Sequence, residues 1–380
     1  MLGLGVIAPT MPLYARTMGA SGIWLGLIYA AFSMSRALFM PLVGNLSDKR
    51  GRKSFIVIGL ALYMIISLGY VWSTRVLQLV WLRFMHGVGS AMVIPIAMAM
   101  VGDIAPEGQE GRIMGRFQVA LFLGFGGGPL ISGMVMGMWG LSEVFYVMGG
   151  MCFIALLLVV FFLAEKPRSA SYSGSDEKAS FLALWRTGLF KGIWAFRFSN
   201  AVGRASVIAF LPVLASAFGV SPEQIGILVS VNILVTGGLQ SFFGVFADRF
   251  SRKKLVITGN VISALSFFMI PLAGNFLHLI LLGILMGLGG ALAFPAAAAL
   301  ATEAGRIHGM GNVMGNFNMA MSIGGIIGAV FSGWMMDLLG ITFVFIFGGV
   351  TGLAGSLACW FWLGGENRNR SSGSKIYADI

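Results

Sequence analysis

The feature that most constrains this chain is a series of apolar runs, each long enough to cross the hydrocarbon layer of a bilayer and separated by short turns or charged clusters. Of the 380 residues, 57% are hydrophobic and only 10% are charged, which leaves too little polar surface for a water-soluble globule. The sequence therefore predicts an all-α membrane protein with twelve transmembrane helices. The expected helices occupy residues 1–18, 22–46, 54–73, 76–102, 112–138, 142–164, 189–216, 223–247, 254–273, 276–302, 310–336 and 341–364.

A polar stretch between the sixth and seventh expected helices divides the chain. This stretch is rich in serine and in charged residues, which is typical of a linker. We therefore expect an N-terminal half of six helices over 1–164, a cytoplasmic linker over 165–188, a C-terminal half of six helices over 189–364 and a cytoplasmic tail over 365–380.

The basic residues predict how the chain is oriented in the membrane. If the linker is cytoplasmic, 19 of the 25 lysines and arginines are cytoplasmic as well, and only Arg16 and Arg75 lie outside. This excess follows the positive-inside rule and predicts a multi-pass protein of the plasma (inner) membrane with both termini in the cytoplasm. It also explains the net charge of +11 without a nucleic-acid partner. The 19 residues are Lys49, Arg50, Arg52, Lys53, Arg112, Arg116, Lys166, Arg168, Lys178, Arg186, Lys191, Arg249, Arg252, Lys253, Lys254, Arg306, Arg368, Arg370 and Lys375.

The two halves repeat each other without gaps at an offset of 200 residues. A parallel repeat of six helices is the plan of a large class of secondary transporters, in which the substrate site lies between the halves. The same register matches Gly3 with Gly203, although the seventh helix already begins near Leu189. The first helix is therefore expected to be truncated by about a dozen residues on its cytoplasmic side, and a naturally short span is the alternative. Matched pairs include Gly44 and Gly244, Asp48 and Asp248, Arg52 and Arg252, Gly87 and Gly287, and Pro95 and Pro295.

The loop between the second and third helices carries the most specific motif. Residues 44–53 resemble the signature loop of the major facilitator superfamily, and residues 244–253 are a weaker copy with Ser251 where glycine is usual. The resemblance implies the fold of that superfamily, with two pseudo-symmetric halves of six helices, and a conformational latch at the cytoplasmic ends of the helices. A positively charged anchor combined with a helix cap is the alternative. The latch residues would be Gly44, Asp48, Arg52, Gly244, Asp248 and Arg252.

Residues 83–89 resemble the fourth-helix motif of the same superfamily, an arginine followed by glycines four and six residues later. In the family this arginine is associated with proton coupling. Arg83 lies about 10 Å into the membrane by helical rise, where an ionisable group is functional by default, and a side chain that reaches back to the surface is the alternative. His86 is a second coupling candidate because histidine titrates near neutral pH, but a packed, hydrogen-bonded histidine is the favoured interpretation.

Glycines along the fifth helix resemble the antiporter motif of the superfamily. This resemblance implies exchange or efflux, as does a first-helix pattern, Leu2-Gly3 with Pro9 and Pro12, that is similar to that of twelve-span drug/proton antiporters. Close helix packing is the alternative, because small residues four apart form a groove. The motif residues are Gly115, Gly124, Gly128, Pro129 and Gly133.

The charges inside the expected helices are basic. Arg197, Asn200 and Arg204 share one face of the seventh helix because they are spaced three and four apart, and Arg36 lies well inside the second helix. No Asp or Glu lies deep in any expected span, so these groups favour an anion over a cationic drug. Structural pairing of the arginines with backbone carbonyls is the alternative. Neutral candidates for the cavity, each of which could instead join helices by hydrogen bonds, are Gln118, Asn232, Thr236, Gln240, Asn318 and Tyr14.

The sequence gives no sign of catalysis. It has no phosphate-binding loop, no metal-ligand spacing and no nucleophile beside a base, so we expect neither an enzyme nor a cofactor. The predicted function is secondary active transport of a small organic solute by alternating access, as proton-coupled efflux by a monomer in the lipid bilayer. Uptake or exchange of an organic anion is the alternative within this class, and a non-transporting receptor or scaffold is the alternative from another class.

Overall fold

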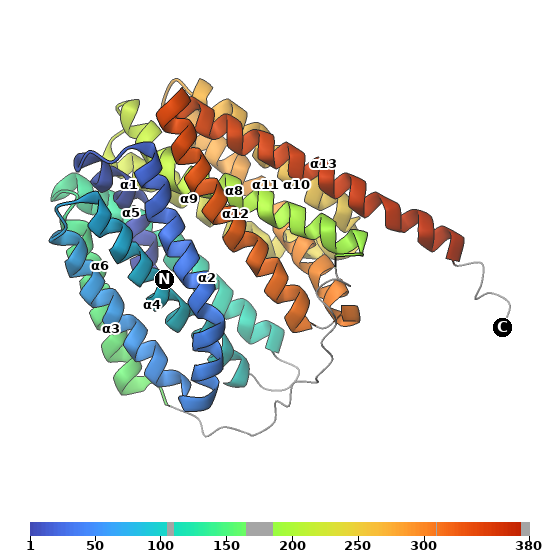
Figure 1. The fold of residues 1–380 in the computed structure, drawn as a ribbon, viewed down its shortest axis with the longest axis horizontal. Helices are drawn as coiled ribbons and strands as arrows, with labels where there is room; N and C mark the ends of the chain where they lie inside the picture. The colour runs from blue at the N-terminus through green and yellow to red at the C-terminus, as the bar shows by residue number, and fades with distance from the viewer. Residues whose placement is uncertain (105–109, 165–184, 309, 374–380) are drawn as a thin grey trace.

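The computed structural model describes residues 1–104, 110–164, 185–308 and 310–373, and these residues form twelve long helices, one short 3-10 helix and no strand (Figure 1). Eleven of the helices are long and apolar enough to cross a membrane, and the remaining one, α1, has 16 residues. The expected all-helical architecture is confirmed. The elements are α1 (Leu2–Thr17), α2 (Gly22–Arg50), α3 (Arg52–Val71), α4 (Val76–Ile104), α5 (Glu110–Met138), α6 (Glu143–Phe162), α8 (Gly188–Ala217), α9 (Pro222–Arg249), α10 (Arg252–Met269), η1 (Ile270–Leu272), α11 (Phe276–His308), α12 (Met310–Leu339) and α13 (Ile341–Gly373).

Some helix ends differ from the limits expected from the sequence. α10 ends at Met269 and passes into η1, because Pro271 has no N–H to continue the helical ladder. α13 continues to Gly373, beyond the expected limit at 364. Most of the expected linker, residues 165–184, and the last part of the expected tail, residues 374–380, lie outside the described residues.

The turns repeat between the two halves as the helices do. Gly19 and Gly219, each between the first two helices of its half, have φ angles of 79° and 72°. Gly140 and Gly340, each before the last helix of its half, have φ angles of 117° and 93°. These conformations require glycine, because a Cβ atom disfavours positive φ. The repeat at an offset of 200 is therefore present in the backbone as well as in the sequence.

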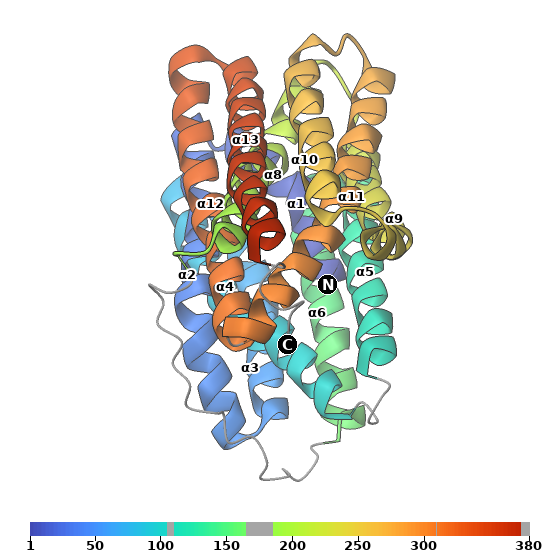
Figure 2. The same ribbon diagram turned by 90° about the vertical axis from the view of Figure 1, so that its right-hand side faces the viewer.

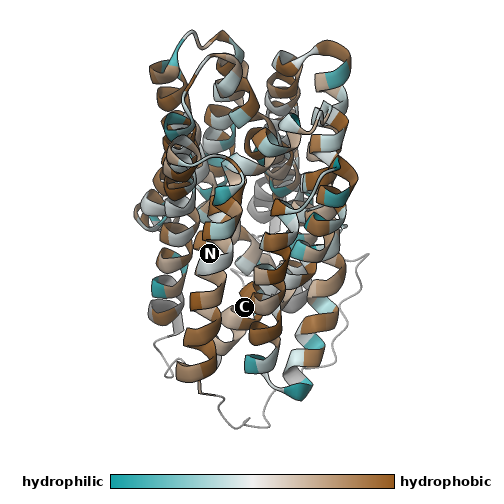
Figure 3. Cartoon of the chain, turned by 90° about the vertical axis from the view of Figure 1, so that its left-hand side faces the viewer, coloured by the Kyte–Doolittle hydropathy of each residue, from teal (hydrophilic) through white to brown (hydrophobic). Residues whose placement is uncertain are grey.

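The helices form two bundles that meet along two pairs of helices. In Figure 1 the bundle of α1–α6 lies beside the bundle of α8–α13, and in Figure 2 the second bundle lies in front of the first. The most extensive contacts between the bundles are those of α2 with α12 and of α5 with α9. Apolar residues make up most of the length of the helices (Figure 3), and large side chains such as Phe162 and Leu272 are exposed, as expected for a surface in contact with lipid.

The two bundles touch at one end of the molecule and separate at the other. A Cβ atom added to Gly22 or Gly26 of α2 would collide with backbone of α12, and one added to Gly226 of α9 would collide with backbone of α5. Near the opposite ends of the same helices, Gly44 and Gly244 have nothing within 4 Å of such an atom. Figure 1 shows α2 and α12 meeting at the top and diverging toward the bottom. We call these the closed end and the open end.

Candidate functional site

A cavity of about 90 Å³, open at its mouth, lies within the C-terminal half. Residues of α8, α9, α10, α11 and α13 line this C-half cavity, and Phe122 of α5 contributes from the other half. Among its lining residues there is no Asp or Glu, and apart from the polar ones the lining is apolar or glycine. Its polar residues are Ser199, Asn200, Arg204, Asn232, Thr236, Asn260 and Ser263.

Arg204 and Asn200 are the two predicted residues of α8 that line the C-half cavity. They lie one helical turn apart, so both side chains leave α8 on the same face. Arg204 is exposed, although it belongs to the middle of a membrane-length helix, because its side chain opens onto the cavity. It has no hydrogen-bond or ion-pair partner among the described residues. This guanidinium is therefore available to a ligand.

Arg197 occupies a different environment on the same helix. It is only 8% exposed, and its guanidinium carbon lies 4.6 Å from the ring centre of Phe294 and 4.8 Å from that of Phe317. Its Nη2 is 2.9 Å from the sulfur of Met321. These cation–π contacts stabilise the charge without a ligand. Arg197 does not line the cavity, and its partners are side chains rather than the backbone carbonyls of the structural alternative.

Arg36 of α2 contributes a third charge to the same region from the N-terminal half. Its Nε is buried without a hydrogen-bond partner. The charges of Arg36, Arg197 and Arg204 lie close enough to interact with one another. With no described acid among the residues that line the cavity, the potential there is positive.

The neutral polar candidates fall into separate groups. Asn232 and Thr236 line the C-half cavity, but Asn232 Nδ2 donates to the Gly283 carbonyl at 3.2 Å and Thr236 Oγ1 to the Gly287 carbonyl at 3.3 Å. Both therefore also join α9 to α11, as in the alternative interpretation. Gln118, Gln240 and Asn318 do not line this cavity.

Tyr14 lies outside the cavity altogether. Its side chain is 7% exposed, its hydroxyl donates to the Tyr70 carbonyl at 3.0 Å, and its ring meets Phe145 edge to face at 4.9 Å. The expected cavity position is thus corrected to a core position of the N-terminal half, because α1 turns this face toward α3 and α6.

Arg83 lies in a buried cluster of aromatic and ionisable side chains in the N-terminal half. Its guanidinium carbon is 4.8 Å from the ring centre of Tyr29 and 5.4 Å from that of Phe32, and the residue is 3% exposed. This burial rules out the alternative of a side chain that reaches the membrane surface. We call Tyr29, Phe32, Tyr63, Tyr70, Arg83 and His86 the N-half cluster.

His86 is fully buried in the same cluster. Its Nδ1 shares a hydrogen bond of 3.1 Å with the Tyr70 hydroxyl, and the Tyr63 ring packs edge to face on the imidazole at 4.6 Å. Its Nε2, like Nε of Arg83, has no hydrogen-bond partner. The imidazole is therefore packed as expected, and it keeps one ring nitrogen without a hydrogen-bond partner.

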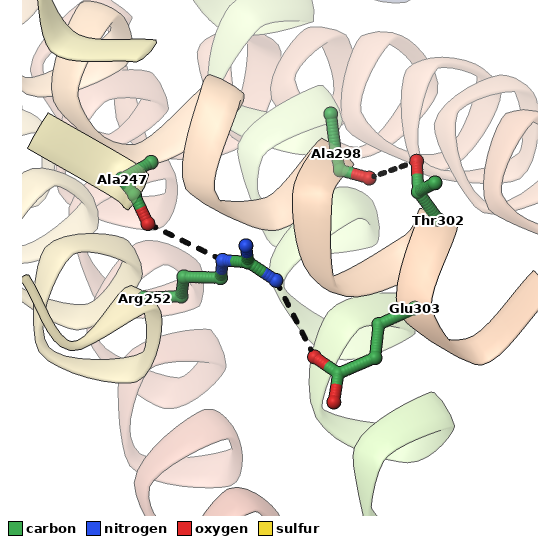
Figure 4. A network of polar contacts seen from close by, with 5 residues as sticks. All are labelled: Ala247, Arg252, Ala298, Thr302 and Glu303. Carbon is green, nitrogen blue, oxygen red and sulfur yellow. Dashed lines mark hydrogen bonds and ion pairs between the residues drawn. The ribbon is translucent and has the colours of Figure 1, made fainter. Parts of the chain in front are cut away.

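The loop motif predicted as a latch lies at the open end. Arg252 joins three helices of the C-terminal half (Figure 4), because its Nε donates to the Ala247 carbonyl at 3.2 Å and its Nη1 lies 3.4 Å from Glu303 Oε2. This copy of the motif therefore ties α9, α10 and α11 together within one half. The side chains of Asp48 and Asp248 lie outside the described residues, and Arg52 begins α3.

The glycines of the predicted antiporter motif have two kinds of neighbour. Gly124 and Gly128 of α5 pack against the start of α1, where an added Cβ would meet Met1 and the backbone of Gly5. Gly133 instead packs against Pro222 and Gly226 of α9, in the other half, and the Pro129 carbonyl faces Gly226 as well. Gly115 lies near the start of α5, and its surroundings are outside the described residues. The motif thus combines packing within a half with the seam between the halves.

At the closed end, Asp337 makes a contact between the halves that none of the sequence motifs marks. Its two carboxylate oxygens accept hydrogen bonds from the backbone N–H groups of Gly22 and Ile23, at 2.5 and 2.8 Å. Asp337 belongs to α12, whereas these donors are the first residues of α2 in the other half. A carboxylate at a helix N-terminus satisfies free N–H groups and the helix dipole. We call this contact the outer cap.

Comparison with protein families matches residues 1–199 and 193–376 to the model of the Major Facilitator Superfamily. The chain belongs to this superfamily. An uncharacterized MFS-type transporter of Methanocaldococcus jannaschii is 31% identical over 355 residues, which cover 92% of each chain. Multidrug resistance protein 2 of Bacillus subtilis is 26% identical over 95% of this chain and 92% of its own. The quinolone resistance protein NorA of Staphylococcus aureus is 25% identical over 89% and 87%.

Solved structures of transporters share the fold of this chain. A bacterial homolog of the human lysosomal transporter Spinster, in an inward-facing and unoccupied conformation, has a TM-score of 0.77 at 14% identity, with 95% of this chain and 92% of its own covered. The nucleoside transporter NupG has a TM-score of 0.78 at 16% identity, with 95% and 96% covered. The predicted fold is confirmed, and the chain is a membrane transporter rather than an enzyme.

Proposed function

We propose that this transporter exports a small organic solute in exchange for protons by alternating access. The observation that carries the proposal is the asymmetry of the contacts between the halves. Small residues bring the backbones together at the closed end, whereas Gly44, Gly244 and Gly315 face open space near the other end. A transporter whose halves are in contact at one end and apart at the other is in one of the two states that alternating access requires.

We assign the open end to the cytoplasm, because the basic residues of both loop motifs cluster there. In this orientation the chain is open to the inside, and the outer cap and the glycine contacts close the path to the outside. A solute inside the cell then reaches the C-half cavity first, as an exporter needs.

Proton coupling is supported by the N-half cluster. Burying a guanidinium and an imidazole in a membrane protein is costly, and such groups are retained where they carry an ion or a substrate. His86 has a free Nε2, and its bonded Nδ1 leads through the Tyr70 hydroxyl toward Arg83. The names of two relatives, which refer to multidrug and quinolone resistance, support efflux.

Exchange of an organic anion is a second candidate, favoured by Arg204. This side chain opens onto the C-half cavity without a partner among the described residues, and no acid lines that cavity. A cationic solute would need a carboxylate to offset its charge, and none lines this cavity.

Proteoliposomes that contain the pH-sensitive dye pyranine distinguish these candidates. With an acidic interior, external ethidium, a quinolone or 1-naphthalenesulfonate should release internal protons in vesicles that contain the protein and not in empty ones. Entry of 1-naphthalenesulfonate without a change in internal pH would replace proton antiport with anion exchange. No protein-dependent flux of any probe would contradict the transport proposal.

A further inference from the structure

We infer that the C-half cavity binds a lipophilic monoanion, with its charged group at Arg204 and Asn200 and its apolar body between α9, α10 and α11. This inference rests on the proposed transport function and names the class of its substrate. Four observations carry it: the origin of the cavity in the repeat, its lining, its charge and its mouth.

The cavity occupies the position that the N-half cluster fills in the other half. At the offset of 200, Phe32, Tyr63 and Met148 correspond to Asn232, Ser263 and Gly348. The first three are bulky side chains packed in the N-terminal half, and the second three line the C-half cavity. The same helical scaffold therefore carries a filled core in one half and an open cavity in the other.

At one matched pair the larger side chain is in the C-terminal half instead, and it fills only part of this space. Phe267 corresponds to Ser67, and its ring packs against Gly203 and Gly348, where an added Cβ would come within 2.8 and 3.2 Å. The space that remains is about 90 Å³, enough for the charged group and part of the body of a small ligand, and it opens at its mouth. A mostly apolar lining with a few convergent polar groups is typical of small-molecule sites.

The charge of the lining selects an anion. Arg204 is the lining residue with a full charge, no carboxylate accompanies it, and Arg36 and Arg197 add to the positive potential. Asn200, one turn away on the same face of α8, supplies an amide that can donate to the same anionic group. A cation at this position would meet repulsion without a compensating acid.

The mouth of the cavity connects ligand binding to the movement of the halves. Phe122 is contributed by α5 of the N-terminal half, and its ring packs on Gly237 of α9, where an added Cβ would lie 2.5 Å from the ring. A ligand body beside Phe122 therefore touches both halves. Rocking of the halves changes this contact, while Arg204 stays with its own half.

The test measures binding of radiolabelled 1-naphthalenesulfonate, a permanent anion, to the full chain in nanodiscs, beside the permanent cation (1-naphthylmethyl)trimethylammonium. We expect the wild type to bind the anion at least tenfold more tightly than the cation. Arg204→Ala should weaken anion binding about 10- to 100-fold, because a charge-assisted contact is lost. Ser263→Tyr, which installs the side chain of the matched N-half position, should abolish it.

Two control variants make the same two kinds of change at positions outside the cavity. Arg75→Ala deletes an exposed arginine of an outer turn, and Leu265→Tyr adds a phenol to an exposed position of α10, so both should bind like the wild type. Val229→Tyr is a second cavity-filling variant, used if Ser263→Tyr does not fold. Preferential binding of the cation, or wild-type anion binding by Arg204→Ala and by a folded cavity-filling variant, would overturn the inference. Proton-coupled ethidium flux that persists in Ser263→Tyr would leave the transport proposal intact while removing this site.

Discussion

Breaking the outer cap should shift the transporter toward a state open to the outside. The carboxylate of Asp337 accepts two backbone hydrogen bonds from the first turn of α2, and these are contacts between helices of opposite halves. The outward-open state must separate these helices, so the cap exists only while the closed end is closed. Asp337→Ala therefore removes a stabilising contact from one state and leaves the other unchanged.

The size of the shift follows from the two hydrogen bonds. Hydrogen bonds to a charged group contribute about 1.5–3 kcal/mol each. Asp337 is exposed, so water competes for the carboxylate, and the pair together is taken at about 1.5–3 kcal/mol. At 1.4 kcal/mol per tenfold change, the population ratio of the outward-open to the inward-open state should rise about 10- to 150-fold.

Spin labels at Thr74 and Asn275, in the outer turns of the two halves, report this change as a longer distance by pulsed electron spin resonance. Glu143→Ala is the matched control, because it removes a carboxylate at a helix N-terminus that contacts only its own half. Gly26→Leu is the positive control, because any Cβ there collides with the Ala329 carbonyl of α12. A distance distribution that is unchanged in Asp337→Ala but longer in Gly26→Leu would refute the outer cap.

Three further predictions concern the remaining sites. Asp48→Asn should sharply reduce solute flux in proteoliposomes while the protein inserts normally into the membrane. Asp248→Asn should reduce the flux less, because its copy of the loop motif is less complete. Wild-type flux in both variants would exclude a latch. His86→Gln can still form a hydrogen bond with Tyr70 but cannot carry a proton, so solute counterflow should persist while proton release falls. Intact proton release together with a lower Tm would indicate that His86 serves packing alone. Arg197→Leu should lose about 0.5–2 kcal/mol of cation–π stabilisation and so lower the Tm, with probe binding within about twofold of the wild type; a larger binding loss would return Arg197 to the substrate site.

The helices, their number and the repeat could be predicted from the sequence, because a membrane-spanning helix must be long and apolar and must satisfy its own backbone. The positions that the motifs single out could also be predicted. The neighbours of those positions could not, because a motif does not say which helix lies opposite. Gly124 and Gly133 belong to one motif on one helix, yet Gly124 packs within its half and Gly133 across the seam.

The candidate site could be predicted only in part, because the spacing of residues along a helix does not say what each side chain faces. The spacing of Arg197, Asn200 and Arg204 places all three on one face of α8, and that face is wide enough to meet two environments. Arg204 opens onto the cavity, and Arg197 lies between two aromatic rings of α11 and α12. Side chains three and four residues apart share a face only approximately, so periodicity alone could not separate them.

Residues matched at the offset of 200 carry information beyond the motifs. Matched positions with similar residues, such as Gly26 and Gly226, mark the scaffold that both halves need. Matched positions that differ in size or charge mark where the halves have diverged, and Tyr63 with Ser263 and His86 with Met286 are such pairs. These pairs line the N-half cluster in one half and the C-half cavity in the other. On the proposed function, one copy of the bundle carries the coupling ion and the other the solute, and the seams at α2–α12 and α5–α9 are where the two must be coupled.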